Sequence, residues 1–100
     1  MLKHVILWTL KPELTEEEKI AVRRGAKEQL EALNGKIEGL VSIKVNIEGI
    51  STSNTDMMLD SVFTDKEALA RYAAHPLHVA AANDYIRPYY IQRSCFDFEE

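Results

Sequence analysis

The spacing of apolar residues along the chain predicts four β-strands. Segments 2–10 and 57–63 are apolar at both odd and even positions, which is typical of strands buried on both faces. Segment 40–47 alternates instead, so one face is expected to be buried, and that face carries Val41, Ile43, Val45 and Ile47. The last predicted strand spans 89–98, and 48–56 is rich in turn residues.

Two helical regions lie between these strands. Segment 15–18 is a capping-box sequence, which predicts a helix that runs to about Leu33. A second capping-box sequence, 64–67, predicts a helix that Pro76 divides in two, because proline disfavours helical geometry at the residue before it. Gly25 lies inside the first helix, where we expect it to permit close packing on the sheet, with room for a ligand as the alternative.

The predicted order of elements is β-α-β-β-α-β. Two right-handed crossovers place both helical layers on one face of a four-stranded antiparallel sheet, with the first and third strands in the middle, which is the ferredoxin-like α+β arrangement. The face toward the helices is assigned His4, Ile6, Trp8, Met57, Leu59 and Phe63. The opposite face is assigned Val5, Leu7, Met58 and Val62.

This opposite face is apolar, and no predicted element is left to cover it. Covering apolar surface gains roughly 25 cal/mol per Å², so such a face favours association. A chain of 100 residues also buries only about two-thirds of its unfolded surface, so it gains from pairing. A two-fold homodimer joined through the open sheet face is the simplest expectation.

The composition limits the kinds of partner that the protein is expected to bind and the compartment in which it is expected to occur. The 100 residues form one predicted domain, 1–100, with a net charge of −4 and no basic stripe, so nucleic acid and anionic membranes are poor partners. We recognise neither a signal peptide nor a segment long and apolar enough to span a bilayer. Cys95 is the one cysteine, which excludes an internal disulfide and favours the cytoplasm, with a buried and inert thiol.

The segment 72–78 carries the candidate chemistry. Tyr72 and His75 are three residues apart, near one helical face, and His78 projects from the first turn after Pro76. Histidine is the commonest general acid or base near neutral pH, and a neighbouring tyrosine can donate to a developing oxyanion. Each residue also has a structural interpretation, as a capping histidine or as a core aromatic residue with a satisfied hydroxyl group.

Two further polar residues lie on the central strands. His4 is expected to point toward the same layer as His75 and His78, but no carboxylate or cysteine has a ligand spacing beside these histidines, so no metal site is predicted. Asp60 is unusual in a central strand, and we expect it either at the rim of the barrel or bonded across the dimer, where the alternation of faces suggests Arg93 as its partner.

Residues spread over the whole chain together resemble a known family. They are the opening Lys3-His4-Val5-Ile6-Leu7, the helix start Thr15-Glu16-Glu17, the run 63–79 with its Tyr-x-x-His-Pro-x-His-Val element, and the closing Phe96-Asp97-Phe98. In these segments the sequence resembles the stress-responsive A/B barrel domain family. The resemblance implies a dimeric α+β barrel, and most members of that family have no assigned activity.

One plant member of the family is a cyclase that closes a linear polyketide by an aldol step. Its tyrosine and histidine match Tyr72 and His78, and its strand histidine matches His4. A further pocket histidine of that enzyme falls on Met57 in this chain, so the expected pocket has one polar group fewer.

We therefore expect one of several functions. The first is binding of a small, partly apolar molecule between sheet and helices, by Ile6, Trp8, Met57, Leu59 and Phe63 with His4, His75, Tyr72 and His78. The second is a cofactor-independent cyclase or isomerase, in which His78 removes a proton next to a carbonyl group and Tyr72 steadies the enolate oxygen. A non-catalytic stress or assembly protein is the third, and a cofactor-free or haem-linked monooxygenase is an alternative that rests on fold alone. No cofactor is predicted.

Overall fold

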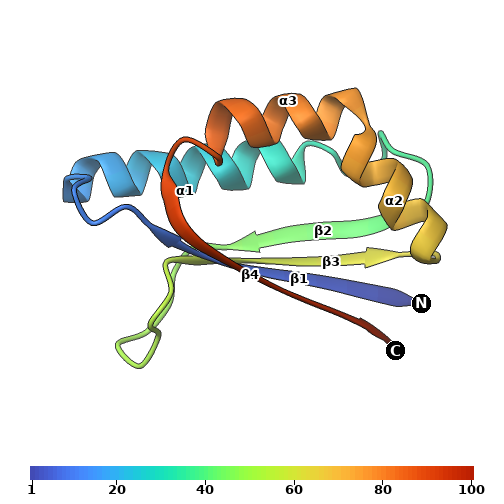
Figure 1. Ribbon diagram of the computed structural model, residues 1–100, viewed down its shortest axis with the longest axis horizontal. Helices are drawn as coiled ribbons and strands as arrows, with labels where there is room; N and C mark the ends of the chain where they lie inside the picture. Colours follow the sequence, from blue (N-terminus) through green and yellow to red (C-terminus); the bar gives the residue numbers. More distant parts are fainter.

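The computed structural model describes all 100 residues and contains the predicted elements (Figure 1). Strand neighbours are antiparallel, and the order across the sheet is β2-β3-β1-β4. The predicted ferredoxin-like α+β fold, with β1 and β3 in the middle, is therefore confirmed. The elements are β1 (Leu2–Leu10), α1 (Glu16–Glu31), β2 (Leu40–Asn46), β3 (Met57–Phe63), α2 (Lys66–Ala74), α3 (Pro76–Tyr85) and β4 (Tyr90–Glu99).

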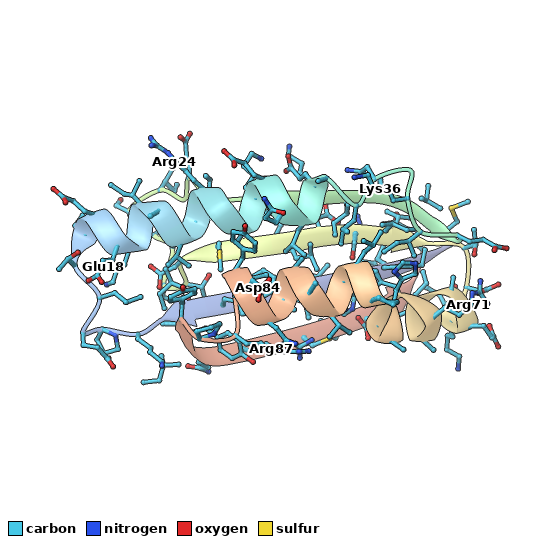
Figure 2. All side chains as sticks on the ribbon, turned by 90° about the horizontal axis from the view of Figure 1, so that it is seen from above. Glu18, Arg24, Lys36, Arg71, Asp84 and Arg87 are labelled. Atoms are coloured by element: carbon cyan, nitrogen blue, oxygen red, sulfur yellow. The ribbon has the colours of Figure 1, made fainter.

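The three helices form one layer on one face of the sheet (Figure 1). Seen from above, α1 and α3 lie side by side along the sheet (Figure 2). A Cβ atom placed on Gly25 of α1 would lie 3.2 Å from Cδ1 of Tyr85 in α3. Gly25 thus permits close approach of two helices, and the expectation of close helix–sheet packing was wrong. No helix has the length and apolar character that crossing a membrane requires.

Side chains cap the helices at their starts. The Thr15 hydroxyl accepts from the Glu18 amide (3.1 Å) and the Glu18 carboxylate accepts from the Thr15 amide (2.8 Å), which confirms the first capping box. The second differs from the prediction, because Asp65 rather than Thr64 is the N-cap of α2 and its carboxylate accepts from the Ala68 amide at 2.8 Å. An aspartate is as good a cap as threonine or better, so the helix begins one residue later.

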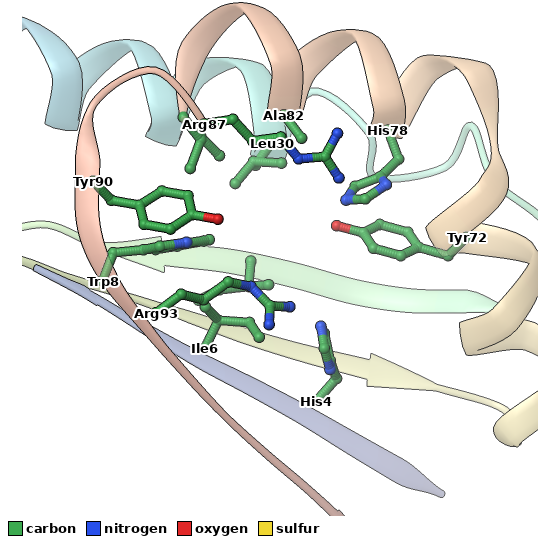
Figure 3. Close-up of a pocket in the computed structure, with 12 residues that line it drawn as sticks. His4, Ile6, Trp8, Leu30, Tyr72, His78, Ala82, Arg87, Tyr90 and Arg93 are labelled. Carbon is green, nitrogen blue, oxygen red and sulfur yellow. The ribbon is translucent and has the colours of Figure 1, made fainter.

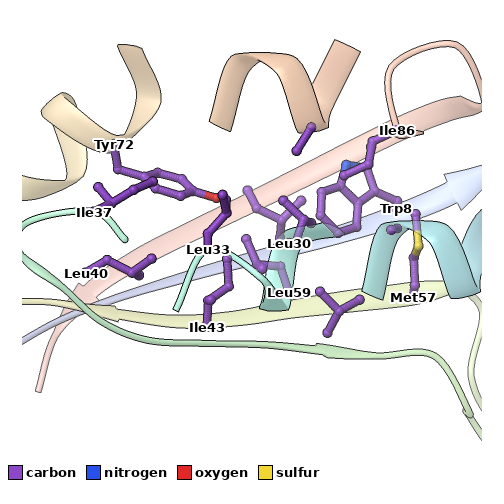
Figure 4. Packing of buried hydrophobic residues seen from close by; sticks show 14 of the residues in the cluster. Trp8, Leu30, Leu33, Ile37, Leu40, Ile43, Met57, Leu59, Tyr72 and Ile86 are labelled. Atoms are coloured by element: carbon purple, nitrogen blue, oxygen red, sulfur yellow. The ribbon is translucent and has the colours of Figure 1, made fainter. Parts of the chain in front are cut away.

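The space between sheet and helices is filled by one hydrophobic core (Figure 4). Ile6 of β1 and Phe63 of β3 point into it from the middle of the sheet, and both are almost fully buried. Helix α1 contributes Leu30, also buried, through its apolar stripe. The helix-facing positions of the central strands are therefore core positions, as their sequence pattern predicted.

The edge strand β2 departs from strict alternation. Leu40 pairs with Phe63 and Ser42 with Val62, so Val41 is an extra residue opposite a single step of β3, as in a β-bulge. Val41 is 49% exposed and Leu40 is buried in its place. The prediction that Val41 faces the core was wrong, because the bulge shifts the faces by one residue at the start of the strand.

Polar side chains of α1 and the turn after it cover the free edge of β2. The Asn34 amide group donates to the Ile43 carbonyl (2.9 Å) and accepts from the Ile43 amide (3.0 Å). Glu31 accepts from the Val45 amide (2.9 Å), and Lys27 donates to the Val45 carbonyl (2.8 Å). These bonds satisfy backbone groups that an edge strand otherwise presents to other chains.

The face of the sheet away from the helices has no cover within the chain. Val5, Leu7, Met58 and Val62 lie on it and are half-buried. Strand β4 adds Phe96, which pairs opposite Val5 and is 70% exposed. Asp60 also lies on this face and forms an ion pair with Lys3 at 2.6 Å. Arg93, the partner suggested for Asp60, pairs opposite Trp8 and so lies on the helix-facing side, away from Asp60.

Candidate functional site

A cavity of about 240 Å³ lies between the helix-facing side of the sheet and helix α3 (Figure 3). Buried apolar side chains of β1 and β3 form its floor, and polar side chains from α2, α3 and β4 surround it. Its lining residues are His4, Ile6, Trp8, Leu30, Leu59, Tyr72, His78, Ala82, Ile86, Arg87, Tyr90 and Arg93. An apolar cavity with a few convergent polar groups is the usual form of a small-molecule site.

Most of the residues that the sequence singled out meet at this cavity. Of the predicted site residues, those that line it are His4, Ile6, Trp8, Leu59, Tyr72 and His78. Three others do not: Met57 and Phe63 are buried in the hydrophobic core at the two ends of β3, and His75 lies between α2 and α3. The His75 Nδ1 atom accepts from the Leu77 amide at 3.1 Å and so caps α3, which is the structural role considered for it.

The break between α2 and α3 fixes the tautomer of His78. Its Nδ1 atom lies 3.2 Å from the carbonyl oxygen of Ala73, and because a carbonyl can only accept, Nδ1 carries the hydrogen. In the neutral ring, Nε2 is then the acceptor. Burial lowers the pKa of His78, and the nearby guanidinium of Arg87 also lowers it, while the bond to Ala73 raises it. The net lowering leaves the ring neutral at pH 7 and able to accept a proton.

Tyr72 packs directly against this histidine. The ring centroids of Tyr72 and His78 are 4.2 Å apart, and Phe63 packs on Tyr72 at 4.9 Å. The hydroxyl group of Tyr72 points into the cavity (Figure 3). Burial raises the pKa of Tyr72 far above its ordinary value, although Arg93 opposes this. The hydroxyl therefore stays protonated and available as a hydrogen-bond donor.

His4 approaches the cavity from the sheet. Its Nδ1 atom lies 2.5 Å from Oδ1 of Asp97, which is its direct neighbour across β1 and β4. A carboxylate accepts, so Nδ1 carries the hydrogen and the carboxylate orients the ring. Figure 3 shows the ring directed from β1 toward the cavity.

One cluster has the composition of a metal site. His4, Cys95 and Asp97 each offer a ligand atom, and these atoms lie within 4.8 Å of one another. This is a different set from the three histidines that the sequence raised. Cys95 is exposed on the edge strand β4, so the expectation of a buried thiol was wrong. Partial burial raises the pKa of Cys95, and the bond to the Asp97 carboxylate at 3.4 Å raises it further, which disfavours the thiolate form.

Sequence reasoning missed half of the cavity wall. Leu30, Ala82 and Ile86 belong to ordinary apolar stripes, and nothing in their spacing distinguishes a cavity wall from a core. Arg93 alternates with Cys95 and Asp97 on β4, so these three residues share a face, but only the pairing of Arg93 with Trp8 places that face under the helices. Arg87 lies in the connection between α3 and β4, and Tyr90 is the first residue of β4, beyond a register shift that interrupts the alternation of the strand.

Comparisons with known proteins define the class and then the family. A search of curated proteins found no match. Among solved structures, a dimeric protein of unknown function with a ferredoxin-like fold from Bacteroides fragilis is 32% identical, with a TM-score of 0.93, over 99% of this chain and 95% of that one. A ferredoxin-like family protein from Mesorhizobium loti is 23% identical, with a TM-score of 0.74, over 99% and 95% of the two chains.

A dimeric ferredoxin-like protein of unknown function from Thermobifida fusca is 20% identical, with a TM-score of 0.79, over 97% of this chain and 88% of that one. The structural class is therefore that of ferredoxin-like proteins, several of which are dimers. Residues 2–100 match the stress responsive A/B barrel domain. The chain belongs to the stress responsive A/B barrel domain family, which confirms the resemblance found in the sequence.

Proposed function

We propose that the protein binds a small, partly apolar molecule in the cavity between sheet and helices. The observation that carries this proposal is the cavity itself, in which an apolar floor of Ile6, Trp8 and Leu59 meets the polar groups of Tyr72 and His78. A well-packed domain of this size has few voids larger than a water molecule. Because an apolar cavity of roughly 150 Å³ holds benzene, one of about 240 Å³ has room for a substituted ring.

A compound screen by thermal shift tests this proposal when it is run on two variants in parallel. Ala82 lines the cavity, so Ala82→Phe fills it, whereas Ala80 is exposed on the same helix and Ala80→Phe is the matched control. We expect compounds that raise the melting temperature of the wild type and of Ala80→Phe but not of Ala82→Phe. If every compound that acts stabilises Ala82→Phe equally, binding is elsewhere. If none acts, the non-catalytic assembly function becomes the better hypothesis.

We also propose that the protein is a homodimer whose subunits join through the open face of the sheet. Structural relatives are dimeric ferredoxin-like proteins. The support within the chain is the apolar set on that face, Val5, Leu7, Met58 and Val62, together with the exposed ring of Phe96. Exposure of such a patch to water is unfavourable. The same face of a second subunit can cover it, because a two-fold axis brings identical patches together.

Sedimentation velocity at micromolar concentration tests the dimer. Val5→Asp and Phe96→Asp each place a charge on the open face, and we expect both variants to sediment as monomers. Ile50 is an exposed apolar residue in the loop between β2 and β3, so Ile50→Asp is the control and should remain dimeric. A wild-type protein that is monomeric under these conditions would contradict the proposal.

A second candidate function is proton transfer next to a carbonyl group, and the geometry of His78 favours it. The bond from Nδ1 to Ala73 leaves Nε2 as a base, and the Tyr72 hydroxyl is a donor at the same cavity. Nε2 would take the proton from the carbon, the electron pair of that bond would move onto the carbonyl oxygen, and Tyr72 would donate a hydrogen bond to the enolate. The monooxygenase alternative still rests on the fold alone.

Hydrogen–deuterium exchange in D₂O separates binding from proton transfer. Carbonyl compounds that the screen identifies are incubated with the protein, and deuterium at the carbon next to the carbonyl is followed by NMR. We expect exchange faster than the buffer rate with the wild type, with losses of about 100-fold in His78→Ala and about 10- to 100-fold in Tyr72→Phe. Exchange at the buffer rate for compounds that still stabilise the wild type would leave a binding protein.

A further inference from the structure

Two arginine side chains lie at the cavity, and no carboxylate lines it. Arg87 follows α3 and Arg93 is on β4, and both residues are exposed, so they mark where the cavity opens to solvent. Figure 3 shows their guanidinium groups on opposite sides of the space into which the Tyr72 and Tyr90 hydroxyls point. The buried apolar floor is at one side of this opening. The cavity therefore has an apolar inner part and a cationic mouth.

These two cations are not neutralised by the protein. None of its four ion pairs includes Arg87 or Arg93. The Asn83 side chain accepts a bond from Arg87 at 2.5 Å, which holds the guanidinium in place without cancelling its charge. Asp97, the acidic residue four positions beyond Arg93 on the same face of β4, is bonded to His4 instead. In a chain of net charge −4, an unpaired pair of arginines is a local excess of positive charge.

We propose that the ligand of this cavity is a small organic carboxylate, whose apolar body packs on Trp8 and whose carboxylate lies between Arg87 and Arg93. The planar guanidinium fork matches a carboxylate bidentately, and charge-assisted bonds of this kind are among the strongest in proteins. The hydroxyls of Tyr72 and Tyr90 are additional donors. This inference rests on the proposed binding function and names the chemical class of its ligand.

The two arginines also influence the pKa values of the rings that line the cavity. Arg87 and Arg93 both contribute to the lowered pKa of His78, after burial, and Arg93 is the group that opposes the raised pKa of Tyr72. Arg93 therefore acts electrostatically on both rings. An anion bound between the arginines offsets their repulsion of the protonated His78 ring, so its binding should raise the pKa of His78.

Trp8 is the single tryptophan of the chain and lines the cavity, so its fluorescence is a direct probe of binding. We would titrate phenylacetate, 3-phenylpropanoate and cyclohexanecarboxylate, the matched neutral amides, and inorganic phosphate. Arg93→Gln removes one cation, and Arg24→Gln is the control on the outward side of α1 (Figure 2). We expect saturable changes with a carboxylate, about tenfold weaker binding of its amide, and about tenfold weaker carboxylate binding by Arg93→Gln only.

The possible outcomes distinguish a failure of the carboxylate inference from a failure of the proposed binding function. An amide that binds as tightly as its acid, with no effect of Arg93→Gln, overturns the carboxylate inference and leaves the binding function in place. Binding of phosphate alone also overturns it, in favour of an inorganic anion. If neither acids nor amides perturb Trp8 at millimolar concentration, both the inference and the binding function are wrong for ligands of this size. Equal losses in Arg24→Gln and Arg93→Gln would show a general charge effect and remove Arg93 from the site.

Discussion

The two faces of the same sheet have opposite relations to the rest of the molecule. On the helix-facing side, Ile6 and Phe63 are almost fully buried, and the layer is filled by the chain's own helices except at the cavity. On the other side, Val5 and Leu7 are only half-buried and Phe96 is 70% exposed. Both faces are apolar, so hydrophobicity alone does not distinguish the face proposed to bind a ligand from the face proposed to pack on a second subunit.

What distinguishes the two faces is the polar chemistry between the apolar residues. The helix-facing side carries His4, Tyr72, His78 and Arg93 around an unfilled volume. The open side carries one ion pair, Lys3 with Asp60, among its apolar residues, with Asp60 directly opposite Val5. Convergent polar groups around a hollow favour a small molecule, whereas a flat apolar patch favours a protein surface. The predictions below test this division of roles.

The largest difference in stability is expected between alanine variants of two phenylalanines, one on each face of the sheet. Phe63 is fully buried on the helix-facing side, so Phe63→Ala should lower the free energy of unfolding by about 3–5 kcal/mol at every protein concentration. Phe96→Ala should have little effect on the monomer but should weaken the dependence of the unfolding midpoint on protein concentration. Urea denaturation at two concentrations measures both. If the two variants lose equal free energies of unfolding at both concentrations, the two faces do not differ in this way.

A smaller difference in stability is expected between alanine variants of two serines, one on each face of the sheet. The hydroxyl of Ser61 is buried and donates to the His4 carbonyl at 2.8 Å, so Ser61→Ala should cost about 1–2 kcal/mol. Ser94 is exposed and pairs opposite Leu7 on the open side, so Ser94→Ala should stay within about 0.5 kcal/mol of the wild type. Urea midpoints of the two variants give the difference. A loss in Ser94→Ala as large as that in Ser61→Ala would argue against the assignment of the two faces.

The two faces should respond to opposite ends of the pH range. The pKa of His78 is lowered from 6.5, so the unfolded chain binds more protons below pH 6.5 and the native state loses stability as the pH falls toward the folded pKa. The pKa of Lys3 is raised from 10.5 by its bond to Asp60, so the stability it gives is lost as the pH rises through its folded pKa.

Melting temperatures measured across the pH range test both signs. His78→Gln should flatten the acid limb of the profile below pH 6.5 and leave the alkaline limb unchanged. Lys3→Gln should flatten the alkaline limb above pH 10.5 and leave the acid limb unchanged. A wild-type protein that gains stability on acidification through this range, relative to His78→Gln, would contradict the burial of His78.

The smallest expected effect concerns the exposed end of the helix-facing side. Cys95 has a raised pKa because of partial burial and the Asp97 carboxylate, so at pH 8 its reaction with iodoacetamide should be several-fold slower than that of a cysteine peptide. Asp97→Asn removes one of these causes and should speed the reaction, whereas Asp60→Asn on the open side should not. A rate in the wild type above that of the peptide would indicate a thiolate and refute this account.

Secondary structure was predictable wherever one strong local signal acted alone. The capping box at Thr15 and the break at Pro76 are local, so their consequences appear where the sequence placed them. The errors fall where two signals compete or where a partner segment decides. Asp65 displaced Thr64 as a cap, and pairing with β3 turned Val41 outward. Six of the cavity residues were predictable because they belong to strongly patterned strands or to the Tyr-x-x-His-Pro-x-His element.

The sequence by itself determined the order of elements, the two apolar faces of the central strands, and the meeting of Tyr72 and His78 at a helix break. Those features follow from periodicity and from the backbone limits of proline, which act within a few residues. Only the tertiary structure decided that Arg93 faces Trp8, that Asp97 orients His4, and that a cavity remains between them. Strand register and the fit of helices onto the sheet set these contacts, and both depend on residues far apart in the chain.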